Sequence, residues 1–145
     1  MLKNTLSALA FLLAVAALVV LVLSHHLFAT NPLLIAVQAG AIGLMLWARM
    51  TFGLRSFHAT ASTSAGGLVT SGPYRFWRHP IYASIIYFVW AGQVQSPTLL
   101  SLGAASLVTL GLVARMLLEE HFLRAAYPEY AQYSRQAKRL IPFVV

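Results

Sequence analysis

Long apolar runs, interrupted at a few places, are the main pattern of this chain. Residues 4–48 contain no Lys, Arg, Asp or Glu. Such a run is too long for one membrane-spanning helix, which needs about 20 residues. A short polar stretch interrupts it, and Asn31-Pro32 interrupts it again, because proline disfavours a helical residue before it and is well accepted at a helix start. The pattern predicts helices over residues 5–23 and 32–47.

Another run free of these four residue types lies in the second half of the chain and is interrupted at Pro97. It predicts a hairpin of two helices, residues 80–94 and 97–118. Beyond the hairpin the chain is polar and aromatic, and residues 119–139 predict an amphipathic helix interrupted at Pro128.

The predicted fold class is all-α: an integral membrane helical bundle of about four transmembrane helices plus a cytoplasmic C-terminal amphipathic helix. Small residues on both hairpin helices would let the helices approach closely. We expect a single membrane domain, residues 1–145, in four parts. These parts are an N-terminal helix pair (1–48), a cytoplasmic loop (49–79), the helical hairpin (80–118) and a C-terminal segment that completes the functional site (119–145).

The position of the charged residues predicts the orientation. They fall at Lys3, in residues 49–78 and in residues 115–139, whereas the connections 24–31 and 95–96 carry none. Four spans place all three charged regions on one side of the membrane, and the positive-inside rule identifies that side as the cytoplasm. The sequence therefore predicts a multi-pass protein with both termini cytoplasmic, in a bacterial inner membrane.

Composition agrees with a lipid environment. Hydrophobic residues make up 59% of the chain and charged residues 9%, against about 25% charged in an average soluble domain. The net charge of +7 does not indicate nucleic-acid binding, because the basic residues sit at the ends of apolar runs, where anionic headgroups attract them. The absence of cysteine excludes disulfides, thiolate ligands and a cysteine nucleophile.

Two polar segments at the membrane boundary are candidates for chemistry. In the first, Gly72-Pro73 predicts a turn and Pro80 opens a helix, whose free backbone N–H groups and dipole favour an anionic partner. Arg78 and His79 flank the same point. The alternative interpretation is an interfacial belt of aromatic and arginine residues.

In the second segment, Glu119 and Glu120 are two of only three acidic residues in a basic protein. Their spacing from Arg115 and Arg124 also fits an ordinary solvated helix stabilised by ion pairs four residues apart. The hairpin, however, returns the chain to the side that it left. Both segments would then frame one pocket with cationic and anionic walls, which suits a zwitterionic ligand such as an amino acid.

These two segments resemble the signatures of the isoprenylcysteine carboxyl methyltransferase family, whose relatives include phospholipid methyltransferases. The first signature is G-x-Y-x-x-x-R-H-P-x-Y-x-G, and the second is E-E-x-x-L followed by aromatic residues and a closing Arg-x-hydrophobic-Pro. The resemblance covers residues 68–142 and departs from the family at Ser84 and Pro128, where glycine is common. The matching residues are Gly72, Tyr74, Arg78, His79, Pro80 and Tyr82, then Glu119, Glu120, Leu123, Tyr127, Tyr130, Tyr133, Arg139 and Pro142.

The resemblance implies an S-adenosylmethionine-dependent membrane methyltransferase that acts on a lipophilic small molecule or lipidated acceptor, with carboxyl O-methylation favoured. Apart from the resemblance, the position of the basic residues argues against a nucleic-acid partner, and the spacing of the histidines argues against a metal. Arg78 and Glu120 are the expected catalytic residues. The expected cofactor-binding residues are Tyr74, Arg78, His79, Pro80, Tyr82, Glu119, Glu120, Tyr127 and Tyr130.

Two other functions remain open from the sequence. One is a small membrane scaffold or transport component without catalysis, which explains the topology but not two motifs that meet at one surface. The other is a membrane oxidoreductase similar to sterol reductases, which share an R-H-P-x-Y element; Glu119-Glu120 and the lack of cysteine argue against it. A carboxylate acceptor needs no base at neutral pH, whereas an amine would need a proton acceptor such as His79.

Overall fold

The computed structural model describes residues 2–53 and 67–141, and every regular element in them is helical. The one strand-like feature in these ranges is an isolated bridge between Trp77 and Lys138. The all-α prediction is therefore confirmed for the described residues. In chain order the helices are α1 (Leu2–Leu23), α2 (Pro32–Phe52), the 3-10 helix η2 (Gly72–Arg75), α3 (Pro80–Gln95), α4 (Leu99–Ala126) and α5 (Tyr130–Gln136).

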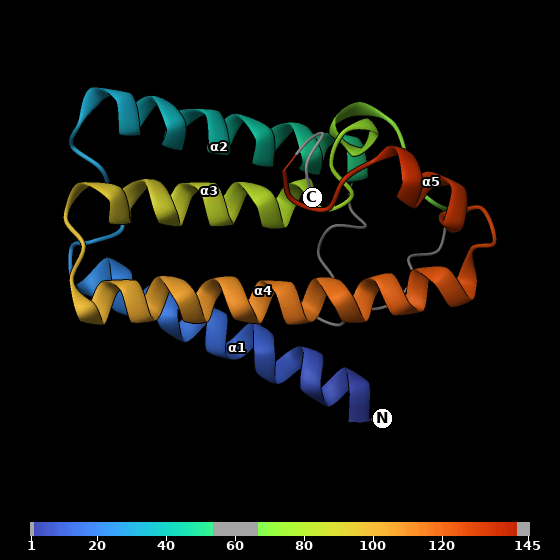
Figure 1. The fold of residues 1–145 in the computed structure, drawn as a ribbon, viewed down its shortest axis with the longest axis horizontal. Coiled ribbons are helices and arrows are strands. Elements are labelled where there is room, and N and C mark those ends of the chain that lie inside the picture. The colour runs from blue at the N-terminus through green and yellow to red at the C-terminus, as the bar shows by residue number, and fades with distance from the viewer. Residues whose placement is uncertain (1, 54–66, 142–145) are drawn as a thin grey trace.

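The four long helices run antiparallel to their neighbours in the order α2, α3, α4, α1 (Figure 1). α2 packs on α3, α3 on α4, and α1 crosses α4 at an angle. The N-terminus, η2 and α5 gather at one end of the bundle, and the α1–α2 and α3–α4 connections lie at the other. The three charged regions of the sequence that the structure describes therefore lie at one end. Two predicted features, the middle of the loop (residues 54–66) and Pro142, lie outside the described residues.

Local signals set the helix starts. At α2, the Asn31 side chain accepts a hydrogen bond from the Leu33 N–H at 3.0 Å, with Pro32 as the first helical residue. At α4, Thr98 and Ser101 form a reciprocal capping box, each side chain accepting from the other's backbone N–H. α4 thus begins two residues later than the predicted start at Pro97.

α4 differs from the prediction at its C-terminal end. The sequence predicted a span that stops at residue 118 and a separate amphipathic helix from 119, but α4 is continuous to Ala126. No glycine or proline interrupts residues 112–127. Ion pairs four residues apart, Arg115–Glu119 at 3.3 Å and Glu120–Arg124 at 3.7 Å, tie the turns together across the expected break. The two glutamates therefore sit on a rigid helix, and the predicted interruption at Pro128 separates α4 from α5.

Among the described residues, two helices rather than four are long and apolar enough to span a membrane: α2 (Pro32–Phe52) and α4 (Leu99–Ala126). The apolar part of α1, Ser7–Leu23, is shorter, and α3 has 16 residues. Large apolar side chains nonetheless face outward on every long helix, for example Leu23, Leu33, Val94 and Leu99. Such a surface is unusual for a soluble monomer and suits contact with lipid.

Amide side chains satisfy the backbone at the end of the bundle away from the termini. Gln38 donates to the Leu27 and Phe88 carbonyls at 2.8 and 3.1 Å and accepts from the Ala29 N–H at 3.1 Å. Gln95 accepts from the Asn31 N–H at 2.9 Å. These bonds fix the α1–α2 connection to α3 without charges, which is the arrangement that an apolar solvent requires of irregular backbone.

Glycine allows α1 to approach α4 closely. A Cβ atom at Gly111 would lie 2.8 Å from the Ala10 carbonyl oxygen and 3.1 Å from the Ala14 Cβ. The first distance is shorter than a van der Waals contact, so the backbones of the two helices meet at this point. Gly111, a small residue of the predicted hairpin, thus permits close packing against α1 rather than against the other hairpin helix.

Gly111→Ala should therefore destabilise the fold, because its methyl group would collide with the backbone of α1. Overpacking of this kind costs about 1–3 kcal/mol. Thermal unfolding in detergent measures the effect. Gly103→Ala is the matched control on the same helix, since nothing lies within 4 Å of a Cβ at that position. Equal melting temperatures for the two variants would contradict the close contact.

Candidate active site

The C-terminal segment is held against the chain that enters α3. The Arg78 N–H donates to the Lys138 carbonyl at 2.6 Å, the His79 N–H donates to the Arg139 carbonyl at 3.3 Å, and the Lys138 N–H donates to the Phe76 carbonyl at 3.0 Å. Tyr87 of α3 also donates to the Leu140 carbonyl. These bonds place Arg139 beside the beginning of α3, where the two predicted segments meet.

Glu120 lies at the centre of a buried ion cluster and is only 3% exposed. Its Oε1 lies 3.0 Å from Arg78 Nη1 and 3.4 Å from His79 Nε2. Arg139 donates to it through Nε and Nη2, the latter at 3.1 Å. Arg124 approaches to 3.7 Å but is mostly exposed, so its contribution is small. Two arginines from two separate segments thus neutralise one carboxylate of α4, and the His79 ring lies beside them.

Glu119 forms a second group on the adjacent face of α4. Its Oε1 accepts a hydrogen bond from the Tyr82 hydroxyl and lies 3.3 Å from Arg115 Nε. Arg115 Nε in turn donates to the Tyr82 oxygen at 2.7 Å. His79 joins the two groups, because its Nδ1 lies 3.8 Å from Glu119 and its ring stacks on Tyr82 with centroids 5.7 Å apart.

Buried tyrosines close the site on the side of η2 and α5. Tyr130 is 1% exposed and packs edge to face on Tyr133, and the Tyr133 hydroxyl donates to the Tyr74 carbonyl at 2.7 Å. Tyr127 packs against the same pair. Burial raises the pKa of the Tyr74, Tyr130 and Tyr133 phenols, so these groups stay protonated at neutral pH.

Three buried polar atoms in this region lack a hydrogen bond of good geometry among the described residues: Arg78 Nε, His79 Nε2 and the Tyr130 hydroxyl, although that hydroxyl interacts with Arg78. The 3.4 Å approach of His79 Nε2 to Glu120 has the distance of an ion pair but not the geometry of a hydrogen bond. Buried polar groups are rarely left unpaired. Three of them together make this region the candidate site for a polar ligand.

The profile of the phospholipid methyltransferase family matches residues 32–130, about two thirds of the chain. The chain belongs to this family. Membership implies methyltransferase activity in general. It agrees with the resemblance found from the two motifs and favours a methyltransferase over the scaffold and reductase alternatives.

A curated relative is the cobalt-zinc-cadmium resistance protein CzcN of Cupriavidus metallidurans. The two sequences are 33% identical over 76 residues, which make up 52% of this chain and 35% of that protein. The chain thus spans about a third of the length of the curated relative that it matches. No solved structure matches the chain.

The structure brings together most of the residues that the sequence predicts as the binding site of this member of the phospholipid methyltransferase family. Arg78, His79, Tyr82, Glu119 and Glu120 form the connected cluster. Pro80 is buried as the first residue of α3, directly after His79, and no side chain caps the helix there. The tyrosines at 74, 127 and 130 form the neighbouring wall. Their roles toward a cofactor stay predictions.

Sequence reasoning gave no site role to Arg115 and Arg139. Arg139 belongs to the second motif, but only the pairing of the C-terminal segment with residues 76–79 shows that it reaches Glu120. The alternative interpretation of the second segment makes Arg115 half of a solvated ion pair, whereas it is 4% exposed. The available signal was its position at the end of a long charge-free run, since a charge next to such a run has apolar surroundings.

Proposed function

We propose that this protein is an S-adenosylmethionine-dependent membrane methyltransferase that methylates a lipophilic acceptor, with a carboxylate as the accepting group. The observation that carries the proposal is the buried ion cluster at the foot of the α3–α4 hairpin. It contains both signs of charge and three buried polar atoms without a hydrogen bond of good geometry. The match to the phospholipid methyltransferase family supports it independently.

The residues of the cluster fit the amino-acid end of the cofactor. Arg78, His79 and Arg139 can hold a carboxylate, and Glu120 can hold an ammonium group. In the structure these residues neutralise one another. A zwitterion can replace both partners at once, which avoids the large penalty of leaving one buried charge alone. Glu119 is proposed for the ribose hydroxyls and the tyrosines for the cationic sulfonium, since aromatic faces attract cations.

We assign the catalytic role to Arg78 and Glu120. By holding the amino-acid end of the cofactor, they would fix the position of its methyl group. When bound, the cofactor would supply an electrophilic methyl group whose transfer to a carboxylate oxygen leaves a neutral thioether and moves no proton. The protein then has to provide position and a dry site rather than a base. The raised pKa of Tyr74, Tyr130 and Tyr133 helps, because protonated phenols do not compete as nucleophiles.

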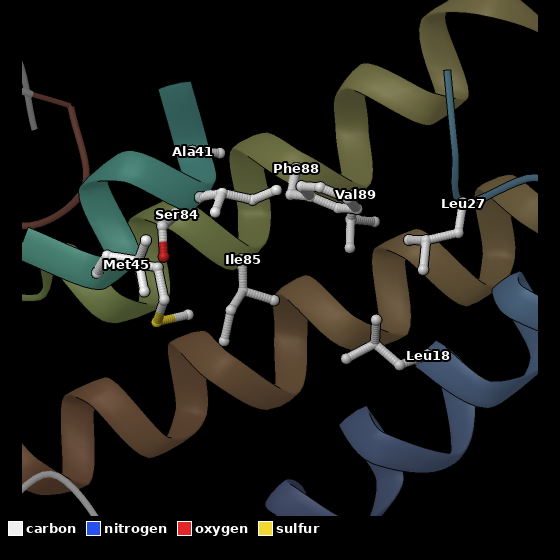
Figure 2. A pocket seen from close by; sticks show the side chains of 10 residues that line it. Leu18, Leu27, Ala41, Met45, Ser84, Ile85, Phe88 and Val89 are labelled. Atoms are coloured by element: carbon white, nitrogen blue, oxygen red, sulfur yellow. The ribbon is translucent and has the colours of Figure 1, made fainter. Parts of the chain in front are cut away.

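An apolar groove supports a lipophilic acceptor. It encloses about 240 Å³ between α1, α2 and α3, and Figure 2 shows Leu18, Met45, Ile85 and Phe88 among the side chains that line it. Its polar side chain, Ser84, donates internally to the Ile81 carbonyl at 2.7 Å. The lining thus offers no polar group to a ligand, which suits the hydrocarbon part of an acceptor that enters from the bilayer.

Cofactor binding tests the proposal first. Isothermal titration of the purified protein with S-adenosylmethionine should show binding, and Glu120→Gln or His79→Ala should weaken it roughly tenfold or more, because a shielded hydrogen-bonding charge is lost. Glutamine is preferred to alanine at position 120, since it keeps an acceptor for Arg78 and Arg139. Arg135→Ala, an exposed cation on α5, is the control and should bind as the parent does. Binding of a nicotinamide dinucleotide instead would overturn the assignment.

The type of acceptor is tested by the stability of the product. With a tritiated methyl donor, S-farnesyl-N-acetylcysteine should become labelled, and alkali should release the label as methanol, as for any methyl ester. Label that enters phosphatidylethanolamine and survives alkali would instead identify an amine acceptor. Ala41→Trp should fill the groove and lower transfer to the farnesylated probe. Ala39→Trp, on the outer face of α2, is the control and should not.

The membrane topology is part of the same proposal: several spans, with both termini in the cytoplasm. Single cysteines are informative because the chain has none of its own. A cysteine at Ser96, in the α3–α4 connection, should react with an impermeant maleimide added outside intact cells, and a cysteine at Gln136 should react only after permeabilisation. The reverse pattern would place the site on the outer side and contradict the orientation.

A further inference from the structure

Arg115 is a buried charge in an apolar helix. It follows a stretch, residues 80–114, without any Lys, Arg, Asp or Glu, and it is 4% exposed. A guanidinium in such a place needs compensating partners, because its desolvation is costly. Two of them are site residues: Tyr82, whose oxygen lies 2.7 Å from Arg115 Nε, and Glu119 at 3.3 Å.

A third partner comes from α1. The guanidinium carbon of Arg115 lies over the Phe11 ring, 5.2 Å from its centroid, within the range of a cation–π interaction. The contact depends on the close packing of α1 against α4, where the backbone at Ala10 meets Gly111. Gly111 lies one turn before Arg115, and Ala10 directly precedes Phe11. The same packing that brings the helices together therefore sets the ring over the guanidinium.

The position of Arg115 also constrains the residues of the ion cluster. Tyr82 accepts a hydrogen bond from Arg115 and donates one to Glu119, so both groups keep a defined position only while the guanidinium keeps its own. Tyr82 stacks on His79 with the ring planes 14° apart. His79 in turn lies 3.4 Å from Glu120. A continuous chain of contacts thus runs from α1 to the centre of the site.

We propose that Phe11 is a positioning residue of the active site, and that α1, which lies outside the family match, completes the site by holding Arg115 against Tyr82 and Glu119. The consequence for turnover rests on the proposed function; the positional claim does not. Phe11 touches neither Glu120 nor Arg78 in this chain of contacts, so it acts on the Tyr82–Glu119 side of the cluster. The charged amino-acid end of the cofactor is assigned above to the Glu120 side and only its ribose hydroxyls to Glu119, so cofactor affinity should change less than the rate of transfer.

The positional claim is tested by nuclear magnetic resonance of the protein with isotope-labelled arginine in detergent. The Arg115 Nε–H signal, assigned by its loss in Arg115→Lys, should be protected from solvent exchange in the parent protein and in Phe11→Trp, which keeps an aromatic face. In Phe11→Leu, which keeps apolar bulk alone, the signal should shift and lose protection. Leu12→Ala, a truncation on the outward side of α1, is the control. An unchanged signal in Phe11→Leu overturns the proposal, whatever the activity.

The functional claim is tested by kinetics with S-adenosylmethionine and S-farnesyl-N-acetylcysteine. Phe11→Leu should lower kcat by roughly three- to thirtyfold, the range expected for loss of a partly buried cation–π contact. The dissociation constant for S-adenosylmethionine should change by less than about twofold, and the titration stoichiometry should equal that of the parent, because loss of folding would lower the stoichiometry together with the apparent kcat. Phe11→Trp should restore kcat. Unchanged kcat in Phe11→Leu, or no rescue by tryptophan, would overturn the role of Phe11. If the parent protein binds no S-adenosylmethionine, the proposed function is refuted, but the resonance test of the positional claim stays valid.

Discussion

The neutralisation of buried charge is the constraint on which the rest of this structure depends. A carboxylate as buried as Glu120 is tolerated only when cations and hydrogen-bond donors surround it. Here the partners come from the segment before α3, from α4 itself and from the C-terminal segment, through Arg78, Arg124 and Arg139. The ends of the hairpin and the C-terminal segment therefore cannot be placed independently of one another. The site and the fold at this end of the bundle are one arrangement.

The two ends of the bundle satisfy their polar groups in different ways. At the end away from the termini, Gln38 and Gln95 bond to backbone groups of the α1–α2 connection, and the described residues there carry no Lys, Arg, Asp or Glu. Neutral amides suffice where the purpose is to close a connection. At the other end, paired charges and buried phenols do the same work at a higher desolvation cost. A charged ligand can bind at this end by replacing the ion-pair partners of the buried side chains. The charged end is therefore the place of the proposed cofactor site.

The sequence predicted the elements that depend on local signals. Asn31-Pro32 and Pro80 mark helix starts through their own chemistry, and α2 and α3 begin where they indicate. Four spans were predicted from the apolar runs, with support from charge position, and two helices among the described residues meet the length and composition of a span. The sequence did not predict that α4 continues past Glu119. The change from apolar to polar residues at that point resembles a helix end, but only Pro128 breaks the helix.

Contacts between distant segments were harder to predict than helices. The meeting of the two motifs followed from topology, since a hairpin returns to its starting side. The position of Arg139 required the backbone pairing of Lys138 with Phe76 and Arg78, which no local pattern encodes. The stacking of Phe11 on Arg115 required the angle at which α1 crosses α4, and that angle depends on side-chain packing at Gly111. Both are long-range consequences of tertiary structure.

Glu119 and Glu120 are adjacent in sequence but belong to different halves of the site. Successive residues of an α-helix point about 100° apart. Glu120 meets Arg78 and Arg139, whose backbones lie outside the four long helices, whereas Glu119 meets Tyr82 and Arg115 within them. Under the proposed function, Glu120 is therefore the group for the amino-acid end of the cofactor, and Glu119 is the group for its ribose hydroxyls. His79 lies against both carboxylates, so a single imidazole ring connects the two halves of the site.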